Sequence, residues 1–283
     1  MMQPPDSGTS WLAANLDGNM LTAWSVTGGA ATPAQVLQLP DNSPAALAES
    51  LRQLRTGEQQ PVLLGGSTLA PLQKVPAAPA RLAPAPVSQG GLNIHALPGL
   101  AQSAPVGMIL GATARLRGFL QLNPDWDGVV CLPGSTVTHW VQISAKEAVS
   151  FQSALTGQLA AAIAQPMLLE AIGGFSKTAL AEAAADSVAK PELLAGRLAA
   201  LQAGVSLGQI PAETARGRLW GLLLGAELAA ARPYWLGQNL ALVAEAPLQP
   251  LYAAALEAQG LPVTTADPLR MTLEGLRRAW SPA

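Results

Sequence analysis

The stretch from Val129 to Ile143 reads Val-Val-Cys-Leu-Pro-Gly-Ser-Thr-Val-Thr-His-Trp-Val-Gln-Ile. Two β-branched runs flank Pro133-Gly134-Ser135-Thr136, which predicts a strand, a tight turn and a returning strand, because Pro presets φ and Gly tolerates positive φ. Backbone N–H groups and two hydroxyls in such a turn can form an anion-binding concavity. An ordinary hairpin without a ligand is the alternative, because Gly and Ser are common in all turns.

A second hairpin is predicted near the N-terminus, over residues 11–26. Asp17-Gly18 separates two apolar, strand-like runs, and Asp-Gly is a strong hairpin signal because both positions tolerate positive φ. A carboxylate at the tip could hold a hydrated cation. The alternative is that Asp17 bonds its own backbone, as Asp in turns commonly does.

Between the two hairpins the pattern alternates between strand and helix. Ser43 and Pro44 suit the cap and the first position of a helix over Ala45–Arg55, and Pro61–Gly66 follows as a buried strand. This order predicts an α/β layer. Residues 76–91 are rich in Pro, Ala and Gly and are predicted to form a long surface loop.

A short strand over Leu92–Leu97 and a helix over Ala112–Leu122 complete the first half. His95 has no second histidine or carboxylate near it in sequence, so a packed structural role is favoured over a catalytic one. A lobe boundary is predicted to separate residues 1–127 from residues 128–283.

The second half is predicted to be mainly helical before it returns to α/β. Glu227 lies in an apolar run, where an unpaired carboxylate would be costly, so a partner from another segment is implied. A structural ion pair is favoured over catalysis. The predicted helices are 153–169, 178–188, 192–204 and 210–231, followed by strand 239–245, helix 247–259, strand 261–265 and helix 268–280.

The composition excludes several classes of protein. The 283 residues are 49% hydrophobic and 12% charged, with a net charge of −2 and no basic cluster, which argues against a nucleic-acid partner. Cys131 is the only cysteine, so no internal disulfide can form. No uncharged apolar run of about 18 residues occurs, and the first residues do not resemble a secretory signal. A cytoplasmic protein without a membrane partner is expected.

Several short motifs carry a resemblance to a known family. They are Leu21-Thr-Ala-Trp24, Leu97-Pro-Gly-Leu100, Leu132-Pro-Gly-Ser135 before His139-Trp-Val141, Leu155-Thr-Gly-Gln-Leu159 and Gly221-Leu-Leu-Leu-Gly-Ala-Glu-Leu228. In this order the chain resembles the 2-dehydro-3-deoxygalactonokinases of the actin-like ATPase and sugar-kinase superfamily. The resemblance implies an α/β fold of two actin-like (ribonuclease H-like) lobes around a central cleft. It also implies ATP, Mg²⁺ and phosphorylation of a 2-keto-3-deoxy sugar acid on its terminal hydroxyl.

The resemblance also implies roles for individual residues. Asp17 and His139 become the candidate catalytic residues, Asp17 the candidate magnesium ligand, and Arg197 a candidate substrate contact. A homodimer is compatible with the family. The candidate phosphate- and nucleotide-binding residues are Gly18, Asn19, Gly134, Ser135, Thr136 and Ala244.

The departures from the family pattern concern charged positions. Asn15 replaces the metal-side Asp, Asp17 replaces a Gly, and the family's Arg-Gly-Glu-Glu-Thr-Gln falls on the uncharged Leu110 to Ala114 and then Arg115. The second hairpin is one residue longer than in the family and lacks its Lys, and Glu245 replaces a Gly near the adenosine site. The scaffold residues persist while the charged ones change. A non-catalytic member that binds a sugar acid or a protein partner is therefore the alternative to a working kinase.

Overall fold

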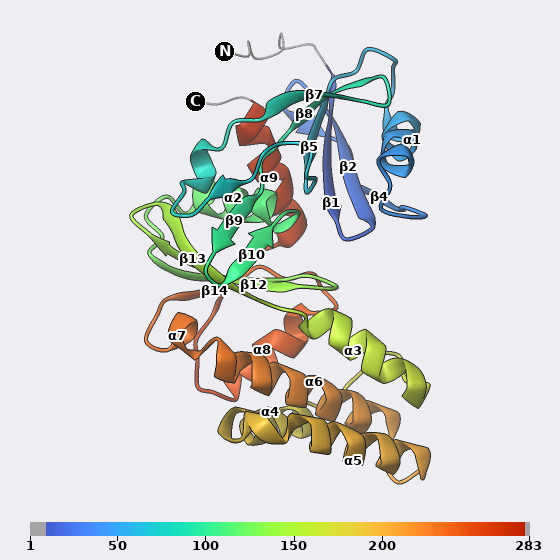
Figure 1. Cartoon of the computed structure of the whole chain (residues 1–283), viewed down its shortest axis with the longest axis vertical. Coiled ribbons are helices and arrows are strands. Elements are labelled where there is room, and N and C mark those ends of the chain that lie inside the picture. The colour runs from blue at the N-terminus through green and yellow to red at the C-terminus, as the bar shows by residue number, and fades with distance from the viewer. Residues whose placement is uncertain (1–9, 281–283) are drawn as a thin grey trace. The chain divides into compact units, whose positions relative to one another are not determined.

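The structure, a computed structural model, describes residues 10–280 and divides into two compact units (Figure 1). The first unit comprises the chain up to Asp127, Ile143–Phe151 and the chain from Asp267 onward. The second comprises Gly128–Gln142 and Gln152–Ala266. This division differs from two continuous lobes, 1–127 and 128–283, because two later segments return to the first unit. The first residues, on which the expectation of no secretory signal depends, lie outside the described part.

The first unit is built on a mixed sheet with the order β3-β2-β1-β5-β8-β7, and β4 also pairs with β2. β1, β5 and β8 are parallel, whereas β2 and β7 pair antiparallel with their neighbours. The predicted first hairpin is confirmed, with Asp17 opposite Met20. The strands are β1 (Trp11–Asp17), β2 (Met20–Thr27), β3 (Ala30–Ala31), β4 (Gln35–Gln38), β5 (Val62–Gly65), β7 (Ala85–Gln89) and β8 (Leu92–Ala96).

A helix packs on each face of this sheet, and alternate side chains of β1 contact the two helices. Leu12 and Ala14 share a buried cluster with residues of α1 (Pro44–Leu54). Trp11, on the opposite face, stacks on Trp280 of α9 (Pro268–Trp280) with 5.0 Å between ring centroids. Successive strand residues point to opposite faces, so one strand supplies both layers.

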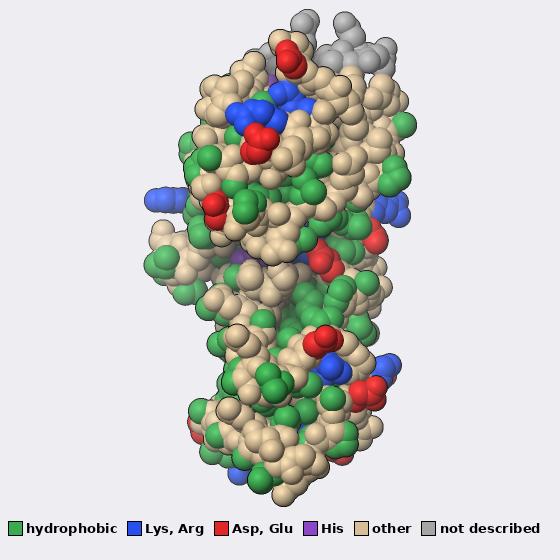
Figure 2. Space-filling model, turned by 90° about the vertical axis from the view of Figure 1, so that its right-hand side faces the viewer, with side chains coloured by type: hydrophobic (Ala, Val, Ile, Leu, Met, Phe, Trp, Pro, Cys, Tyr) green, Lys and Arg blue, Asp and Glu red, His purple; other side chains and the backbone are tan. Residues whose placement is uncertain are grey.

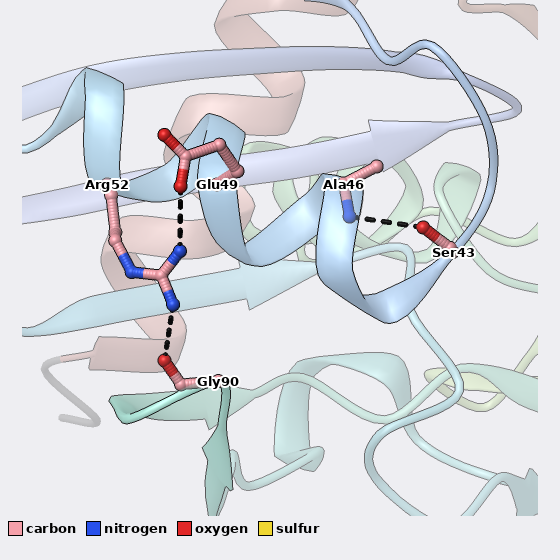
Figure 3. Close-up of polar contacts among 5 residues, drawn as sticks. All are labelled: Ser43, Ala46, Glu49, Arg52 and Gly90. Atoms are coloured by element: carbon pink, nitrogen blue, oxygen red, sulfur yellow. Dashed lines mark hydrogen bonds and ion pairs between the residues drawn. The ribbon is translucent and has the colours of Figure 1, made fainter.

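The α1 helix confirms the predicted cap. The Ser43 hydroxyl accepts a hydrogen bond from the Ala46 N–H at 3.1 Å (Figure 3). Further along the helix, Arg52 donates to Glu49 at 2.8 Å and to the Gly90 carbonyl at 2.6 Å. The side chain thus ties α1 to the turn between β7 and β8.

The prediction of a long loop over residues 76–91 is wrong. The segment contains a 3₁₀ turn, η1 (Pro79–Arg81), and the strand β7, which stands at the end of the sheet order. An edge strand tolerates proline because one of its hydrogen-bonding sides is unused. The buried Arg117 guanidinium donates to the carbonyls of Pro79 at 2.8 Å and Leu82 at 3.0 Å, which orders the segment.

The prediction that His95 has a packed structural role is confirmed. Its ring lies edge-on against Trp280, with 5.0 Å between centroids, and burial lowers the pKa of the imidazole. The residue therefore packs in the layer between β8 and α9.

A small second sheet, with the order β10-β9-β6, also belongs to the first unit. Its strands are β6 (Gln73–Lys74), β9 (Leu100–Ser103) and β10 (Val106–Ile109). The Gln102 side chain exchanges hydrogen bonds with the backbone of Phe151, which attaches the later segment 143–151 to this unit. That attachment was not predicted.

The strands of the second unit belong to a five-stranded sheet with the order β13-β12-β11-β14-β15, of which most of β13 is assigned to the first unit. The predicted hairpin over residues 129–143 is confirmed as β11 (Gly128–Pro133) and β12 (Thr138–Ser144), and β11 lies parallel to β14 (Leu240–Leu242). The predicted helix 153–169 is partly wrong: β13 (Glu147–Ala154) continues to residue 154, and the helix follows it. The remaining elements are β15 (Thr264–Thr265), α3 (Thr156–Ala164), η2 (Gln165–Met167), α4 (Lys177–Ala189), η3 (Pro191–Leu193), α5 (Leu194–Ser206), α6 (Ala212–Ala230), α7 (Arg232–Trp235) and α8 (Gln249–Glu257).

Glycines let α6 approach the backbone of α4 along its length. A Cβ at Gly217, Gly221 or Gly225 would strike a backbone carbonyl of Ser176, Leu180 or Ala184, respectively. Both series advance by four residues, so the contact follows one face of each helix.

The prediction that helix 268–280 completes the second unit is wrong, because α9 belongs to the first unit. Its start is capped by Asp267, whose carboxylate accepts from the Arg270 N–H at 2.6 Å. It packs instead against α2 (Ala112–Leu122), where a Cβ on Gly118 or Gly275 would strike the partner helix. The α/β class is confirmed, but the order of helices along the chain does not give their partners.

Candidate functional site

The first hairpin presents three of the candidate residues at its tip. Gly18 has φ +63° and open space around it, and the Asp17 side chain is 36% exposed. The Asn19 carbonyl accepts from the Leu39 N–H at 2.8 Å, which fixes the start of β2. The tip is therefore an ordered turn with a carboxylate beside a positive-φ glycine.

Backbone from two other segments approaches this hairpin closely. Gly66 has φ +83°, and a Cβ there would collide with the backbone of Leu16. A Cβ on Gly111, immediately before α2, would lie 3.1 Å from both Cα and Cβ of Asp17. The ends of β1 and β5 and the start of α2 therefore converge on one point, at the carboxyl edge of the parallel strands where α/β proteins commonly bind ligands.

Two buried polar atoms lie at this edge. Asn15 is 7% exposed and Ser67 is 6% exposed, and neither Asn15 Oδ1 nor Ser67 Oγ has a hydrogen-bond partner among residues 10–280. A Cβ at residue 65 would lie 2.6 Å from Asn15 Oδ1, so Gly65 makes room for the amide. Buried polar groups are usually satisfied, so these two mark the edge as a place for a polar ligand group or water.

Asp17 faces a cation from α2. Arg115 Nη2 lies 3.7 Å from Asp17 Oδ2, and the Arg115 side chain is only 4% exposed. Asp17 stands where the family pattern has Gly, and Arg115 stands where it has Gln. The two charged residues that replace uncharged residues of the family pattern, Asp17 and Arg115, thus form an ion pair with each other.

The residues present do not fit a protein-held magnesium ion. Mg²⁺ is usually anchored by carboxylates, but Asn15 offers a neutral amide and Asp17 is engaged with Arg115. Within residues 10–280 no group of three or more His, Cys, Asp and Glu side chains is arranged to hold a metal. Asp17 as a magnesium ligand stays a prediction that its surroundings do not favour.

A double-mutant cycle tests the Asp17–Arg115 pair. Asp17→Asn, Arg115→Gln and their combination should show a coupling of about 1 kcal/mol in urea unfolding, because the guanidinium is buried although the carboxylate is partly exposed. Glu49→Gln and Arg52→Gln form the matched control, since that pair is 45–60% exposed and should couple by only about 0.3 kcal/mol. Equal coupling in the two cycles would contradict the assignment.

The second hairpin carries Gly134, Ser135 and Thr136 in its turn. The Gly134 N–H donates to the Val137 carbonyl at 3.0 Å, and the side chains of Ser135 and Thr136 are exposed. The start of α3 lies against the turn, because Gln158 N–H donates to the Thr136 carbonyl at 3.2 Å. Ser135 and Thr136 are thus exposed on a turn whose backbone is hydrogen-bonded to the start of α3.

His139 and Trp140 lie on opposite faces of β12, as strand geometry requires. His139 is 8% exposed, and its Nδ1 lies 2.8 Å from the Ser153 hydroxyl on β13. Trp140 is fully buried, and its indole N–H donates to Glu227 Oε1 at 2.8 Å. The catalytic role of His139 stays a prediction.

Glu227 is the centre of a buried polar network that the sequence did not reveal. Its Oε2 accepts from the hydroxyls of Thr156 and Tyr252, the latter at 3.1 Å, while Oε1 accepts from Trp140. The expected ion pair is wrong, because these partners are all neutral. Burial raises the pKa of Glu227 to about 7, and the three hydrogen bonds oppose that rise.

The other two candidate residues lie elsewhere in the second unit. Ala244 is buried just after β14, and Glu245 beside it is exposed. Arg197 on α5 donates to the carbonyls of Asp186 at 2.8 Å and Lys190 at 3.3 Å, so it caps the end of α4. It also lines a pocket of about 300 Å³ formed by α4, α5 and α6. A substrate contact by Arg197 stays a prediction.

Comparison with known proteins identifies the family. The sequence profile of the 2-keto-3-deoxy-galactonokinases matches residues 6–279. The chain belongs to this family. It is 28% identical over 274 residues to the 2-dehydro-3-deoxygalactonokinase of Escherichia coli K12, covering 90% of this chain and 91% of the relative. It is 32% identical over 196 residues to a Rhizobium meliloti 1021 protein named as a probable 2-dehydro-3-deoxygalactonokinase, DgoK1, but that match spans 66% of this chain and only 64% of the relative.

Solved structures support the same assignment. A Sinorhizobium meliloti protein named for the same enzyme superposes with a TM-score of 0.82 at 25% identity, covering 96% of this chain and 97% of that one. The activator of 2-hydroxyisocaproyl-CoA dehydratase from Clostridium difficile superposes with a TM-score of 0.55 at 8% identity, covering 96% and 94% of the two chains. The second likeness shows the fold alone. The predicted actin-like ATPase fold is confirmed.

Several of the 2-keto-3-deoxy-galactonokinase motifs supply residues that pack and hydrogen-bond inside the second unit. Trp140, Thr156 and Glu227 come from three separate motifs, and all three meet in the buried network. Gly221 and Gly225, from the same motif as Glu227, make the close contact with α4. These family residues are therefore scaffold residues of the second hairpin and its supporting helices.

Proposed function

We propose that this protein is an ATP-dependent kinase that phosphorylates the terminal hydroxyl of a 2-keto-3-deoxy sugar acid. The observation that carries the proposal is the family match over residues 6–279. The two ordered hairpins that the family resemblance assigns to phosphate binding support it. Within residues 10–280 no helix is long and apolar enough to cross a bilayer.

The second hairpin supplies hydroxyl groups for phosphate oxygens in this proposal. Phosphoryl transfer depends mainly on positioning and on stabilising the charge of the transferred group. Ser135 and Thr136 expose their hydroxyls, and Gly18 and Asn19 supply the turn of the first hairpin. Asp17 and His139 are the candidate proton acceptors for the sugar hydroxyl.

An assay of ADP release tests the kinase. With 2-keto-3-deoxygalactonate and ATP in a magnesium-containing buffer, ADP release should require the sugar acid. The double variant Ser135→Ala/Thr136→Ala should raise the KM for ATP about tenfold, because two hydrogen bonds to phosphate oxygens are lost. Ser88→Ala removes an exposed hydroxyl from β7 and is the matched control. Unchanged kinetics of the double variant would remove the hairpin from the site.

A non-catalytic family member is the second candidate, and the replaced charges favour it. Asn15 is neutral, Asp17 is paired with Arg115, and the two glutamates of the family pattern fall on Ala112 and Thr113. Losing such groups together removes most of the charge stabilisation that phosphoryl transfer needs. Calorimetric binding of the sugar acid without any ADP release would identify this case, whereas turnover excludes it.

The remaining proposals concern the setting of the protein. We place it in the cytoplasm as a homodimer that acts on a small molecule, and sedimentation at micromolar concentration tests the dimer. On the face drawn in Figure 2, basic side chains are interspersed with acidic ones and form no continuous stripe. The net charge of −2 also gives no support for a nucleic-acid partner.

A further inference from the structure

The carboxyl group of Glu227 is connected to the strand that leaves the second hairpin turn. The hydroxyl of Thr138, the first residue of β12, shares a short hydrogen bond with the Tyr252 hydroxyl, which in turn donates to Glu227 Oε2 at 3.1 Å. Trp140, two residues further along the same face, donates to Oε1. Glu227 on α6 is therefore bonded to β12 directly through Trp140 and indirectly through Tyr252 of α8, which bonds Thr138.

The same carboxyl group is connected to the helix behind the turn. The hydroxyl of Thr156, the first residue of α3, donates to Glu227 Oε2. The next residue, Gly157, lies so close to the turn that a Cβ would strike the Ser135 carbonyl. Gln158 then donates its N–H to the Thr136 carbonyl. The buried Glu227 side chain therefore bonds both β12, which follows the turn, and α3, which packs against the turn.

We propose that Glu227 is a positioning residue for the second hairpin. It fixes the turn Gly134–Val137 against the start of α3 and thereby sets the affinity of the turn for an anionic phosphate group, without touching that group. The identity of the ligand rests on the proposed function, but the control of the turn by Glu227 does not.

A carboxylate suits this role because it can accept from every donor around it. The ionised group uses its two oxygens for Trp140, Thr156 and Tyr252, whereas a protonated or amide group has to act as a donor on one side. The titratable groups close to the network are Tyr252, whose pKa burial raises well above its usual value, and the Cys131 thiol.

Hydrogen exchange tests the inference without any ligand. In Glu227→Gln, the protection factors of the backbone N–H groups in residues 134–138 and 156–159 should fall about tenfold relative to the unaltered protein at pH 8, because one well-made hydrogen bond of the network is lost. Protection in β1 and β5 of the first unit should not change. Glu182→Gln, an exposed substitution on α4, is the matched control. A uniform loss across the chain, or no loss at the turn, would overturn the proposal.

Thr156 separates positioning from general packing. Thr156→Ser keeps the hydroxyl and should preserve the protection of the turn, whereas Thr156→Val keeps the volume and should lose it about tenfold. ATP affinity by calorimetry should follow the same order. If ATP does not bind to any variant, the proposed function fails while the exchange data still decide the role of Glu227. Equal protection in Thr156→Ser and Thr156→Val would contradict that role.

Discussion

Replacing Gly221 with alanine should destabilise the protein by about 2–3 kcal/mol. The added Cβ would strike the Leu180 carbonyl and lie 2.8 Å from the Ala183 Cβ and 3.1 Å from the Ala184 N–H nitrogen. These atoms belong to the backbone and first side-chain carbon of α4, so they cannot rotate away. The two helices have to separate, which loosens the buried cluster around Leu180 and Leu222.

Gly196 in α5 provides the control for this prediction. It is also a helical glycine of the second unit, but a Cβ there meets no atom within 4 Å. Gly196→Ala should therefore stabilise the protein by about 0.5–1 kcal/mol, because alanine favours the helix. Urea unfolding of both variants measures the difference. If Gly221→Ala is no less stable than Gly196→Ala, the close contact between α4 and α6 is wrong.

Elements specified by neighbouring residues could be predicted from the sequence. The Asp17-Gly18 turn lies between paired strands, Ser43 caps α1, and Asp267 caps α9. In each case the backbone conformation depends on the residue itself and on residues within about one helical turn. Such local signals can therefore be recognised without knowledge of the tertiary structure.

Elements that depend on distant partners could not be predicted. Residues 85–89 form an edge strand because β8 offers a free side, although their proline content argues for a loop. The helix α9 continues the α/β alternation of the second unit in sequence, yet it packs on α2 in the first. Local periodicity reports which face of an element is buried but not what covers it.

The candidate site shows the same limit. The turn residues predicted both hairpins, the family resemblance gave them a phosphate-binding role, and both hairpins are formed. It could not reveal that Asp17 meets Arg115, since these residues are far apart in the chain and neither follows the family pattern. Nor could it reveal the partners of Glu227, because hydroxyl and indole donors carry no charge signal in a sequence.

The free energy of unfolding should fall with rising pH between about 4.5 and 7 because of Glu227. Its carboxyl group has a pKa of about 7 in the folded protein, raised by burial from an ordinary value of 4.5. In this window the folded state therefore binds more protons than the unfolded state, and stability declines as pH rises. A shift of this size corresponds to about 3 kcal/mol, all of it present below the unfolded pKa and lost above the folded one.

Glu227→Gln isolates this contribution from those of the other carboxylates. The amide does not titrate, so the difference in unfolding free energy between the two proteins should change by about 3 kcal/mol from pH 4.5 to pH 8, in favour of the variant at the higher pH. Urea unfolding at half-unit pH intervals measures the two curves. Parallel curves would mean that the three donors keep the carboxylate ionised throughout, and that its hydrogen bonds from Trp140, Thr156 and Tyr252 outweigh the cost of burying its charge.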